Sequence, residues 1–199
     1  GYRQLRLSQK EFTMTERLAV RGSGRNASPY SRLSIGLHWF MLLLLAAVYA
    51  CIELRELYPR GSDIREGLKT WHFMLGLTVF GLVALRLVAR IGSPRPAPPR
   101  SWSDGLAPLV HLALYAVMIV MPLLGWLALS ADGKAVPFFG FELPPLVRPN
   151  ETLAGQVEEI HETVGTAGYW LVGVHAAAAL FHHYVLRDGV LRRMLPGVG

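Results

Sequence analysis

Hydrophobic positions in this chain are gathered into four long blocks that contain no charged residue, and polar segments separate them. Three of the blocks reach the roughly 20 residues that a membrane-spanning α-helix needs. The shortest block suffices if its flanking residues, Lys69 and Arg86, extend their charged ends to the two interfaces. The pattern therefore predicts an all-α membrane protein with a bundle of four transmembrane helices. The charge-free blocks are Leu33–Ile52, Thr70–Leu85, Gly105–Ala131 and Thr163–Leu186.

A soluble helical protein is the alternative explanation of these blocks, and the length of the chain argues against it. Four nearly uncharged helices would have to be covered by what remains of 199 residues, of which only 17% are charged. Too little polar chain is left for that purpose. We expect one membrane domain over residues 30–199, preceded by an arginine-rich segment, 1–29, that forms a flexible cytoplasmic extension or a tag.

Basic residues are distributed unevenly between the two sides of the predicted bundle. Seven lie in residues 1–32, four in residues 86–104 and three after Leu186, whereas the opposite loops, 53–69 and 132–162, have six basic and ten acidic residues. Because Lys and Arg are enriched in cytoplasmic loops, both termini are predicted to be cytoplasmic. The net charge of +6 then reflects membrane topology, and no nucleic acid is needed to explain it.

Capping and helix-breaking residues set the expected boundaries of the helices. Ser28 or Ser31 can cap the first helix. The second helix is expected from about residue 67 to about residue 90, and the proline-rich connector over residues 92–99 cannot be helical. The fourth helix is expected from near residue 156 to near residue 186.

Three aromatic residues crowd into the loop before the fourth helix. Phe138, Phe139 and Phe141 lie within residues 137–145, together with a glycine and several prolines. Aromatic side chains are unusual in a solvated loop but are enriched at membrane–water interfaces. We expect this loop to form an interfacial flap over the outer end of the bundle.

Cysteine occurs only once, which limits the cofactors that the chain can hold. Cys51 can form no disulfide within the chain, and no Cys-x-x-Cys-His sequence is present for covalent attachment of a c-type haem. Iron–sulfur clusters held by several thiolates are excluded for the same reason. Any haem must therefore be of the b type, and Cys51 is best explained as a small buried apolar residue.

Four of the seven histidines lie in the apolar regions, where an imidazole is costly unless something binds it. His161 and His175 are fourteen residues apart, which in an α-helix places them on one face about 21 Å apart. His38 lies about 10 Å from the cytoplasmic start of its helix, at a depth similar to that of His175. His72 and His161 both lie near the outer starts of their helices. The depths predict two pairs, His38 with His175 and His72 with His161, as axial ligands of two haem b groups.

Hydrogen bonding within the bundle is the alternative role for each of these histidines, and it would suffice for a lone one. Four imidazoles at matching depths favour two haems instead. Zinc would need a compact set of three or four ligands, and His161 and His175 are too far apart to share one ion. Glycines near the ligands allow either the close approach of a flat porphyrin or close packing of helices. They are Gly76, Gly81, Gly165, Gly168 and Gly173.

Two further histidines lie towards the cytoplasmic side. His182 follows His175 by seven residues and shares its face about 10 Å closer to the cytoplasm, beside the rim of the inner haem. There it could hydrogen-bond a haem propionate, donate a proton to a quinone carbonyl, or simply contact lipid headgroups. His111, early in the third helix, could be a propionate partner or a substitute ligand, and it ranks below His38.

Several motifs of this chain resemble the bacterial cytochrome b561 family, and the resemblance covers about residues 30–196. It implies a four-helix protein of the bacterial inner membrane that holds two b haems, the outer one by His72 and His161 and the inner one by His38 and His175. The motifs are Tyr30-Ser31-Arg32-Leu33 with His38-Trp39, Trp71-His72, Pro137-Phe138-Phe139-Gly140, His161-Glu162-Thr163, and the stretch from Gly173 to Tyr184.

The same resemblance implies superoxide oxidase activity. Superoxide would give up an electron on the periplasmic side, and ubiquinone would be reduced on the cytoplasmic side, where His182 matches the quinone-side histidine of the family. Lys69, Lys134 and Arg148 are the outer cations that could attract a superoxide anion, although the outer loops have a net negative charge. Membrane lipid, superoxide and ubiquinone are the expected partners, without an obligatory protein partner.

Two other functions fit parts of the pattern. A quinone-linked cytochrome b subunit of a periplasmic dehydrogenase or hydrogenase would use the same haems but would take electrons from a protein. Such a subunit needs a sizeable outer docking surface, and the outer loops here are short. A non-redox membrane scaffold or transporter would bind no haem, and an absorption spectrum of the purified protein separates it from the other two.

Overall fold

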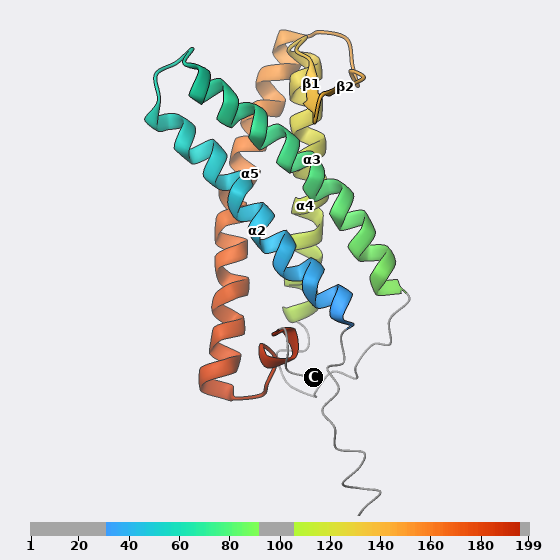
Figure 1. Ribbon diagram of the computed structural model, residues 1–199, viewed down its shortest axis with the longest axis vertical. Coiled ribbons are helices and arrows are strands. Elements are labelled where there is room, and N and C mark those ends of the chain that lie inside the picture. Colours follow the sequence, from blue (N-terminus) through green and yellow to red (C-terminus); the bar gives the residue numbers. More distant parts are fainter. Residues whose placement is uncertain (1–30, 92–105, 196–199) are drawn as a thin grey trace, which may run out of the picture.

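The computed structural model describes residues 31–91 and 106–195 of the chain (Figure 1). The predicted N-terminal extension over residues 1–29 and the proline-rich connector over residues 92–99 lie outside the described residues. Within the described part, four helices are long and apolar enough to cross a membrane. The predicted number of spans is therefore confirmed.

The elements form two helix pairs and one small hairpin. Figure 1 shows α2 beside α3 as an antiparallel pair and α4 beside α5 as a second pair, with the hairpin at the end of the bundle opposite the C-terminal segment. Following the predicted topology, we call the hairpin end the outer end and the opposite end the inner end. The elements are α2 (Arg32–Leu54), η1 (Arg55–Leu57), α3 (Asp63–Ile91), α4 (Leu106–Ala131), β1 (Val136–Phe138), β2 (Phe141–Leu143), α5 (Glu151–Phe181), η3 (His182–Leu186) and η4 (Arg192–Met194).

Two helices begin earlier than the sequence pattern predicts, because polar first turns extend them beyond the apolar blocks. Helix α5 begins at Glu151, after Asn150, whose side-chain oxygen accepts a hydrogen bond from the amide of Leu153 at 3.0 Å. Helix α3 begins at Asp63, with acidic residues in its first turn that favour the positive end of the helix dipole. Ser31 caps α2, as one of the two predicted candidates, by accepting from the amide of Ser34.

The bundle buries a small apolar core and exposes most of its other apolar side chains. Met41 and Leu44 of α2 pack with Val79 and Val83 of α3, and residues of α4 cover this cluster. Large apolar side chains elsewhere are exposed, such as Trp170 at 76%. Exposure of an apolar side chain to lipid costs no free energy, because lipid tails are as apolar as the side chain. The distribution therefore fits a bundle that is surrounded by a bilayer.

A pair of tyrosines links α2 to α5. The rings of Tyr49 and Tyr169 lie with their centroids 4.1 Å apart, and the hydroxyl of Tyr49 donates to the carbonyl of Gly165 at 3.0 Å. The hydroxyl of Tyr169 donates to the carboxylate of Glu53 at 2.6 Å. Gly168 leaves room for this arrangement, because a Cβ atom there would collide with the hydroxyl of Tyr49.

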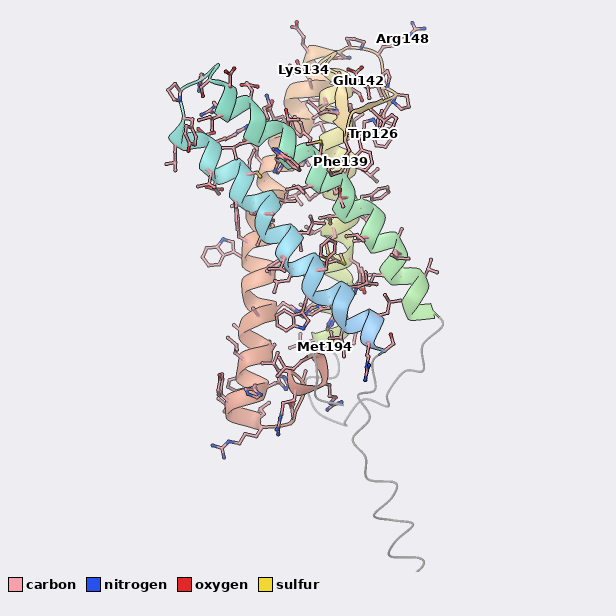
Figure 2. The ribbon with its side chains drawn as sticks, viewed as in Figure 1. Trp126, Lys134, Phe139, Glu142, Arg148 and Met194 are labelled. Carbon is pink, nitrogen blue, oxygen red and sulfur yellow. The ribbon has the colours of Figure 1, made fainter. Side chains whose placement is uncertain are left out.

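The aromatic loop folds as a two-stranded antiparallel hairpin in which Val136 pairs with Leu143. Phe139 and Gly140 form its turn, both with positive φ angles of 46° and 88°, as a tight hairpin turn requires. The amide of Phe139 donates to the sulfur of Met74 at 3.3 Å, and the ring of Phe139 lies against Trp71. Figure 2 shows the hairpin lying over the outer part of α3, as predicted for an interfacial flap.

Replacing Gly168 by alanine is expected to weaken the contact between α2 and α5. The added methyl group displaces Tyr49, which costs about 1–3 kcal/mol as overpacking of a tight site. Thermal unfolding of the detergent-solubilised protein should show a lower midpoint for Gly168→Ala. The matched control is Gly173→Ala on the same helix, where a Cβ would meet nothing within 4 Å. Equal midpoints for the two variants would contradict the close contact at Gly168.

Candidate haem-binding sites

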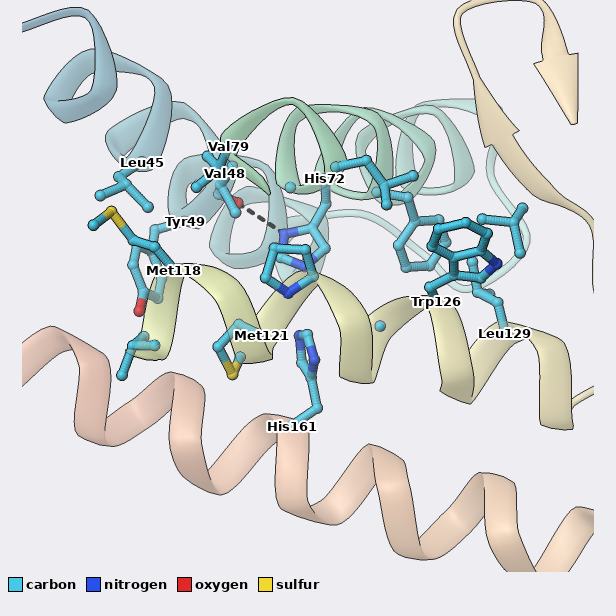
Figure 3. A pocket seen from close by; sticks show the side chains of 17 residues that line it. Leu45, Val48, Tyr49, His72, Val79, Met118, Met121, Trp126, Leu129 and His161 are labelled. Carbon is cyan, nitrogen blue, oxygen red and sulfur yellow. Dashed lines mark hydrogen bonds between the residues drawn. The ribbon is translucent and has the colours of Figure 1, made fainter. Parts of the chain in front are cut away.

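The structure brings His72 of α3 and His161 of α5 together at the outer end of the bundle. Their ring centroids lie 6.2 Å apart, and the ring planes form an angle of 74° (Figure 3). Two imidazoles bound to one metal ion by bonds of about 2 Å have centroids roughly 6 Å apart once the ring radii are added. The observed separation therefore suits two axial ligands of one iron.

An apolar cavity surrounds this outer pair. A mostly apolar wall with a few polar groups is common in cofactor sites. All four transmembrane helices contribute to its wall, and Trp126 lies towards its outer end (Figure 3). Labelled residues of the wall besides the two histidines are Leu45, Val48, Tyr49, Val79, Met118, Met121, Trp126 and Leu129.

The two outer imidazoles have different hydrogen-bonding environments. Nδ1 of His72 lies 2.9 Å from the carbonyl oxygen of Val48, so Nδ1 holds the proton and Nε2 keeps its lone pair for a metal. Nδ1 of His161 is buried without a hydrogen-bond partner of good geometry among the described residues, and its ring edge lies against Gly125. A buried nitrogen without a partner is costly in an apolar cavity. A bound group that contacts this ring would offset the cost.

A second pair, His38 of α2 and His175 of α5, lies nearer the inner end. The ring centroids of this pair are 6.4 Å apart at an angle of 69°, which suits two axial ligands in the same way. His111 of α4 joins them, with its ring centroid 5.2 Å from that of His175. Nδ1 of His111 lies 2.6 Å from the carbonyl oxygen of Ala107, so its N–H donates a hydrogen bond to the backbone of the same helix.

Arg86 of α3 lies beside the inner pair. One of its guanidinium nitrogens is 3.2 Å from Nδ1 of His38, and its Nε donates to the hydroxyl of Tyr115 at 3.2 Å. The expectation that Arg86 extends to the membrane interface is therefore wrong. Hydrogen bonds to polar groups inside the bundle satisfy the guanidinium there, and they place a positive charge next to the predicted inner ligands.

Comparison with known proteins identifies the family. The sequence model described as prokaryotic cytochrome b561 matches residues 29–197. The chain belongs to the prokaryotic cytochrome b561 family. Family members bind b haems and transfer electrons within a membrane, and the four spans agree with this placement.

Three relatives share most of the chain. "Cytochrome b561 homolog 1" of Escherichia coli (strain K12) is 38% identical over 170 residues, covering 84% of this chain and 97% of the relative. "Probable superoxide oxidase CybB" of Yersinia pestis is 35% identical over 170 residues, covering 84% and 96%. "Cytochrome b562" of Cereibacter sphaeroides is 30% identical over 173 residues, covering 83% and 94%.

The glycines of this cytochrome b561 chain divide between the two roles considered for them. Gly165 and Gly168 serve helix packing, because added Cβ atoms would meet Met121 and Tyr49. Gly76 lines the outer cavity, and a Cβ there would meet nothing within 4 Å. Gly81 and Gly173 likewise have no atom near an added Cβ, and they do not line this cavity. Only Gly76 therefore combines open space with the wall of the outer cavity.

The predicted superoxide-attracting cations do not line the outer cavity. Lys134 forms an ion pair with Asp132, and the hydrogen bond from Lys134 raises the pKa of its ammonium group. Arg148 is exposed and points away from the bundle in Figure 2. Their role as an entrance for superoxide stays a prediction, and the ion pair with Asp132 weakens the attraction that Lys134 can exert.

Filling the open space at Gly76 is expected to remove the outer haem. A Cβ atom at Gly76 would meet nothing within 4 Å, and a leucine side chain there would take up space in the cavity that His72 and His161 line. Haem content per chain should fall from two towards one in Gly76→Leu, as measured by the pyridine haemochrome spectrum. Gly81→Leu on the same helix is the control and should keep its haems. Full haem content in Gly76→Leu would show that the cavity is not the haem site.

Proposed function

We propose that this chain is a di-haem superoxide oxidase of the bacterial inner membrane, with both termini in the cytoplasm. The observation that carries the proposal is the pair of imidazole couples at axial-ligand separation, His72 with His161 and His38 with His175. Helix α5 contributes one ring to each couple, about 21 Å apart along its axis. The similarity to a probable superoxide oxidase over nearly the whole membrane domain supports the choice of electron donor.

Each part of the chain has a defined task in this reaction. When bound, the two b haems accept and pass on single electrons. His72 and His161 would hold one haem near the outer end, where the apolar wall of the cavity excludes water. His38 and His175 would hold the other haem, and the positive charge of Arg86 beside His38 would favour its reduced state.

The overall reaction balances with two superoxide anions for each quinone. Two superoxide anions lose one electron each and leave as two molecules of oxygen. One ubiquinone gains these two electrons together with two protons and becomes ubiquinol. Lys134 and Arg148 are the proposed outer cations for the anion, and His182 is the proposed proton donor to the quinone at the inner end.

A second candidate function follows from the exposed hairpin. Phe141 of the hairpin is 74% exposed and Leu146 48%. If they form a docking face for a partner protein, the chain would act as a quinone-linked cytochrome b subunit of a periplasmic dehydrogenase or hydrogenase. The two functions differ in the electron donor, which can be tested directly.

A pulse of superoxide is expected to reduce the haems of the purified, oxidised protein. The measurement is the reduced-minus-oxidised absorption spectrum after the pulse, with superoxide dismutase present in a control sample to remove the anion. Added ubiquinone should then return the spectrum to the oxidised form. If dithionite reduces the haems but superoxide does not, the partner-subunit function is favoured.

Replacing His175 by alanine is expected to remove the inner haem and to leave the outer one. His175 is the only member of the inner couple on α5, whereas the outer couple keeps both rings. Haem content should fall from two towards one per chain, with loss of one component in a redox titration. His111→Ala is the matched control, because His111 contacts the ring of His175 but is not a proposed ligand. Loss of the inner haem in His111→Ala would show that the pairing is wrong.

A further inference from the structure

A carboxylate lies against the proposed proton donor at the inner end of α5. The helix ends at Phe181, and the chain continues through the π-helical turn η3 into Arg187. Nδ1 of His182 forms a short hydrogen bond with the carboxylate of Asp188, with 23% and 29% of the two side chains exposed. This pair lies outside both histidine couples and takes no part in the haem sites described above.

We propose that Asp188 is a positioning residue that orients the ring of His182 while it delivers protons to a quinone. The inference rests on the proposed function, because it assigns the proton supply of that reaction. It requires that the carboxylate is firmly held, that it is ionised, and that its hydrogen bond leaves the other ring nitrogen for the quinone.

The backbone around Asp188 holds its carboxylate in place. Arg187 and Gly189 on either side both have left-handed backbone conformations, with φ angles of 53° and 76°. One carboxylate oxygen accepts from the amide of Val190 at 3.0 Å, and the other contacts His182. The carbonyl of Asp188 accepts from the guanidinium of Arg193 at 3.3 Å. Both oxygens are therefore fixed by partners.

The C-terminal segment that contains this turn is tied back to the bundle. Nε1 of Trp39 on α2 donates to the carbonyl of Met194 at 2.6 Å, across 155 positions of sequence. Figure 2 shows Met194 beside the inner end of α2. Since Trp39 follows the predicted ligand His38, this bond holds the Asp188 turn at the inner end of the bundle, where the inner couple lies.

Charges around the pair keep Asp188 ionised. Partial burial by itself raises the pKa of Asp188, but the hydrogen bonds from His182 and from the amide of Val190 outweigh it and lower the pKa below its usual value. Asp188 is therefore ionised at neutral pH, and it loses its negative charge only in acid, when the carboxylate becomes protonated. Arg193 adds a positive charge that also lowers the pKa of Asp188. His183, Tyr184, Arg187 and Arg192 line a small pocket in the same segment of the chain.

The chemistry follows from which ring nitrogen Asp188 occupies. With Nδ1–H donated to the carboxylate, Nε2 is left to deliver a proton to the quinone. The Nε2–H bond breaks as a new O–H bond forms on the reduced quinone oxygen, and the ring regains a proton from cytoplasmic water. Two such cycles supply the two protons, while the proposed activity supplies the two electrons.

A purely structural role for Asp188, as a cap for the turn, is the alternative. Asparagine separates the two roles, because its side-chain oxygen can still accept from the amide of Val190 but has no negative charge. Asp188→Asn should therefore keep the turn and lose only the charge beside His182. Asp188→Glu restores the charge with a longer side chain. Glu142→Gln, at the exposed hairpin far from the inner end, is the matched control for loss of one carboxylate.

Reoxidation of the reduced haems by ubiquinone is expected to be about tenfold slower in Asp188→Asn at neutral pH. The difference between Asp188→Asn and the parent protein should shrink in acid, where the carboxylate of Asp188 becomes protonated. Asp188→Glu should recover part of the rate, and Glu142→Gln should match the parent protein. Haem content and reduction by superoxide should be unchanged in all variants. Stopped-flow absorption over a range of pH gives these rates.

The outcomes separate this inference from the proposed function. If ubiquinone fails to reoxidise the haems of the parent protein, the proposed function fails at its inner half. If the parent is reoxidised and Asp188→Asn shows the same rate and pH profile, the inference is overturned. A constant slowing at every pH, with no recovery in Asp188→Glu, would likewise overturn it in favour of a structural cap.

Discussion

The cost of an imidazole in an apolar medium is the constraint on which this structure depends. Four such rings lie within the spans of the bundle, and the fold gives His72 and His38 one hydrogen-bond partner each, the carbonyl of Val48 and the guanidinium of Arg86. It places them in two couples whose centroids are 6.2 and 6.4 Å apart, each drawing its rings from two helices. Nδ1 of His161 is buried without a hydrogen-bond partner of good geometry in the part of the chain that the structure describes.

The two ends of the bundle treat their imidazoles differently. At the outer end a neutral backbone carbonyl, that of Val48, faces His72, and the surrounding wall is apolar. At the inner end the guanidinium of Arg86 faces His38, and a third imidazole, His111, lies beside His175. A positive charge favours the reduced state of a nearby redox centre. The asymmetry is therefore in the direction that the proposed inward transfer of electrons would require.

The sequence was sufficient for the spans and for the grouping of the histidines, because both depend on local periodicity. Charge-free blocks define the helices, and the fourteen-residue interval on one helix defines two depths. The polar first turns of α3 and α5 were missed because they extend beyond the apolar blocks that served as the guide. The inward turn of Arg86 and the contact of Asp188 with His182 were also missed. Both depend on distant segments or on a left-handed turn, for which periodicity contains no information.

The spacing of the two histidines on helix α5 limits which sequence changes this protein can accept. One of its faces supplies a ring to each couple, so the thirteen positions between His161 and His175 fix the relative orientation of both centres. A single inserted residue would rotate one ring by about 100° about the helix axis relative to the other. Substitutions on the lipid-facing side of this interval leave both rings in place. An insertion or deletion within it would turn His161 or His175 away from the histidine that it faces on the neighbouring helix. The length of this interval should therefore vary far less than its composition.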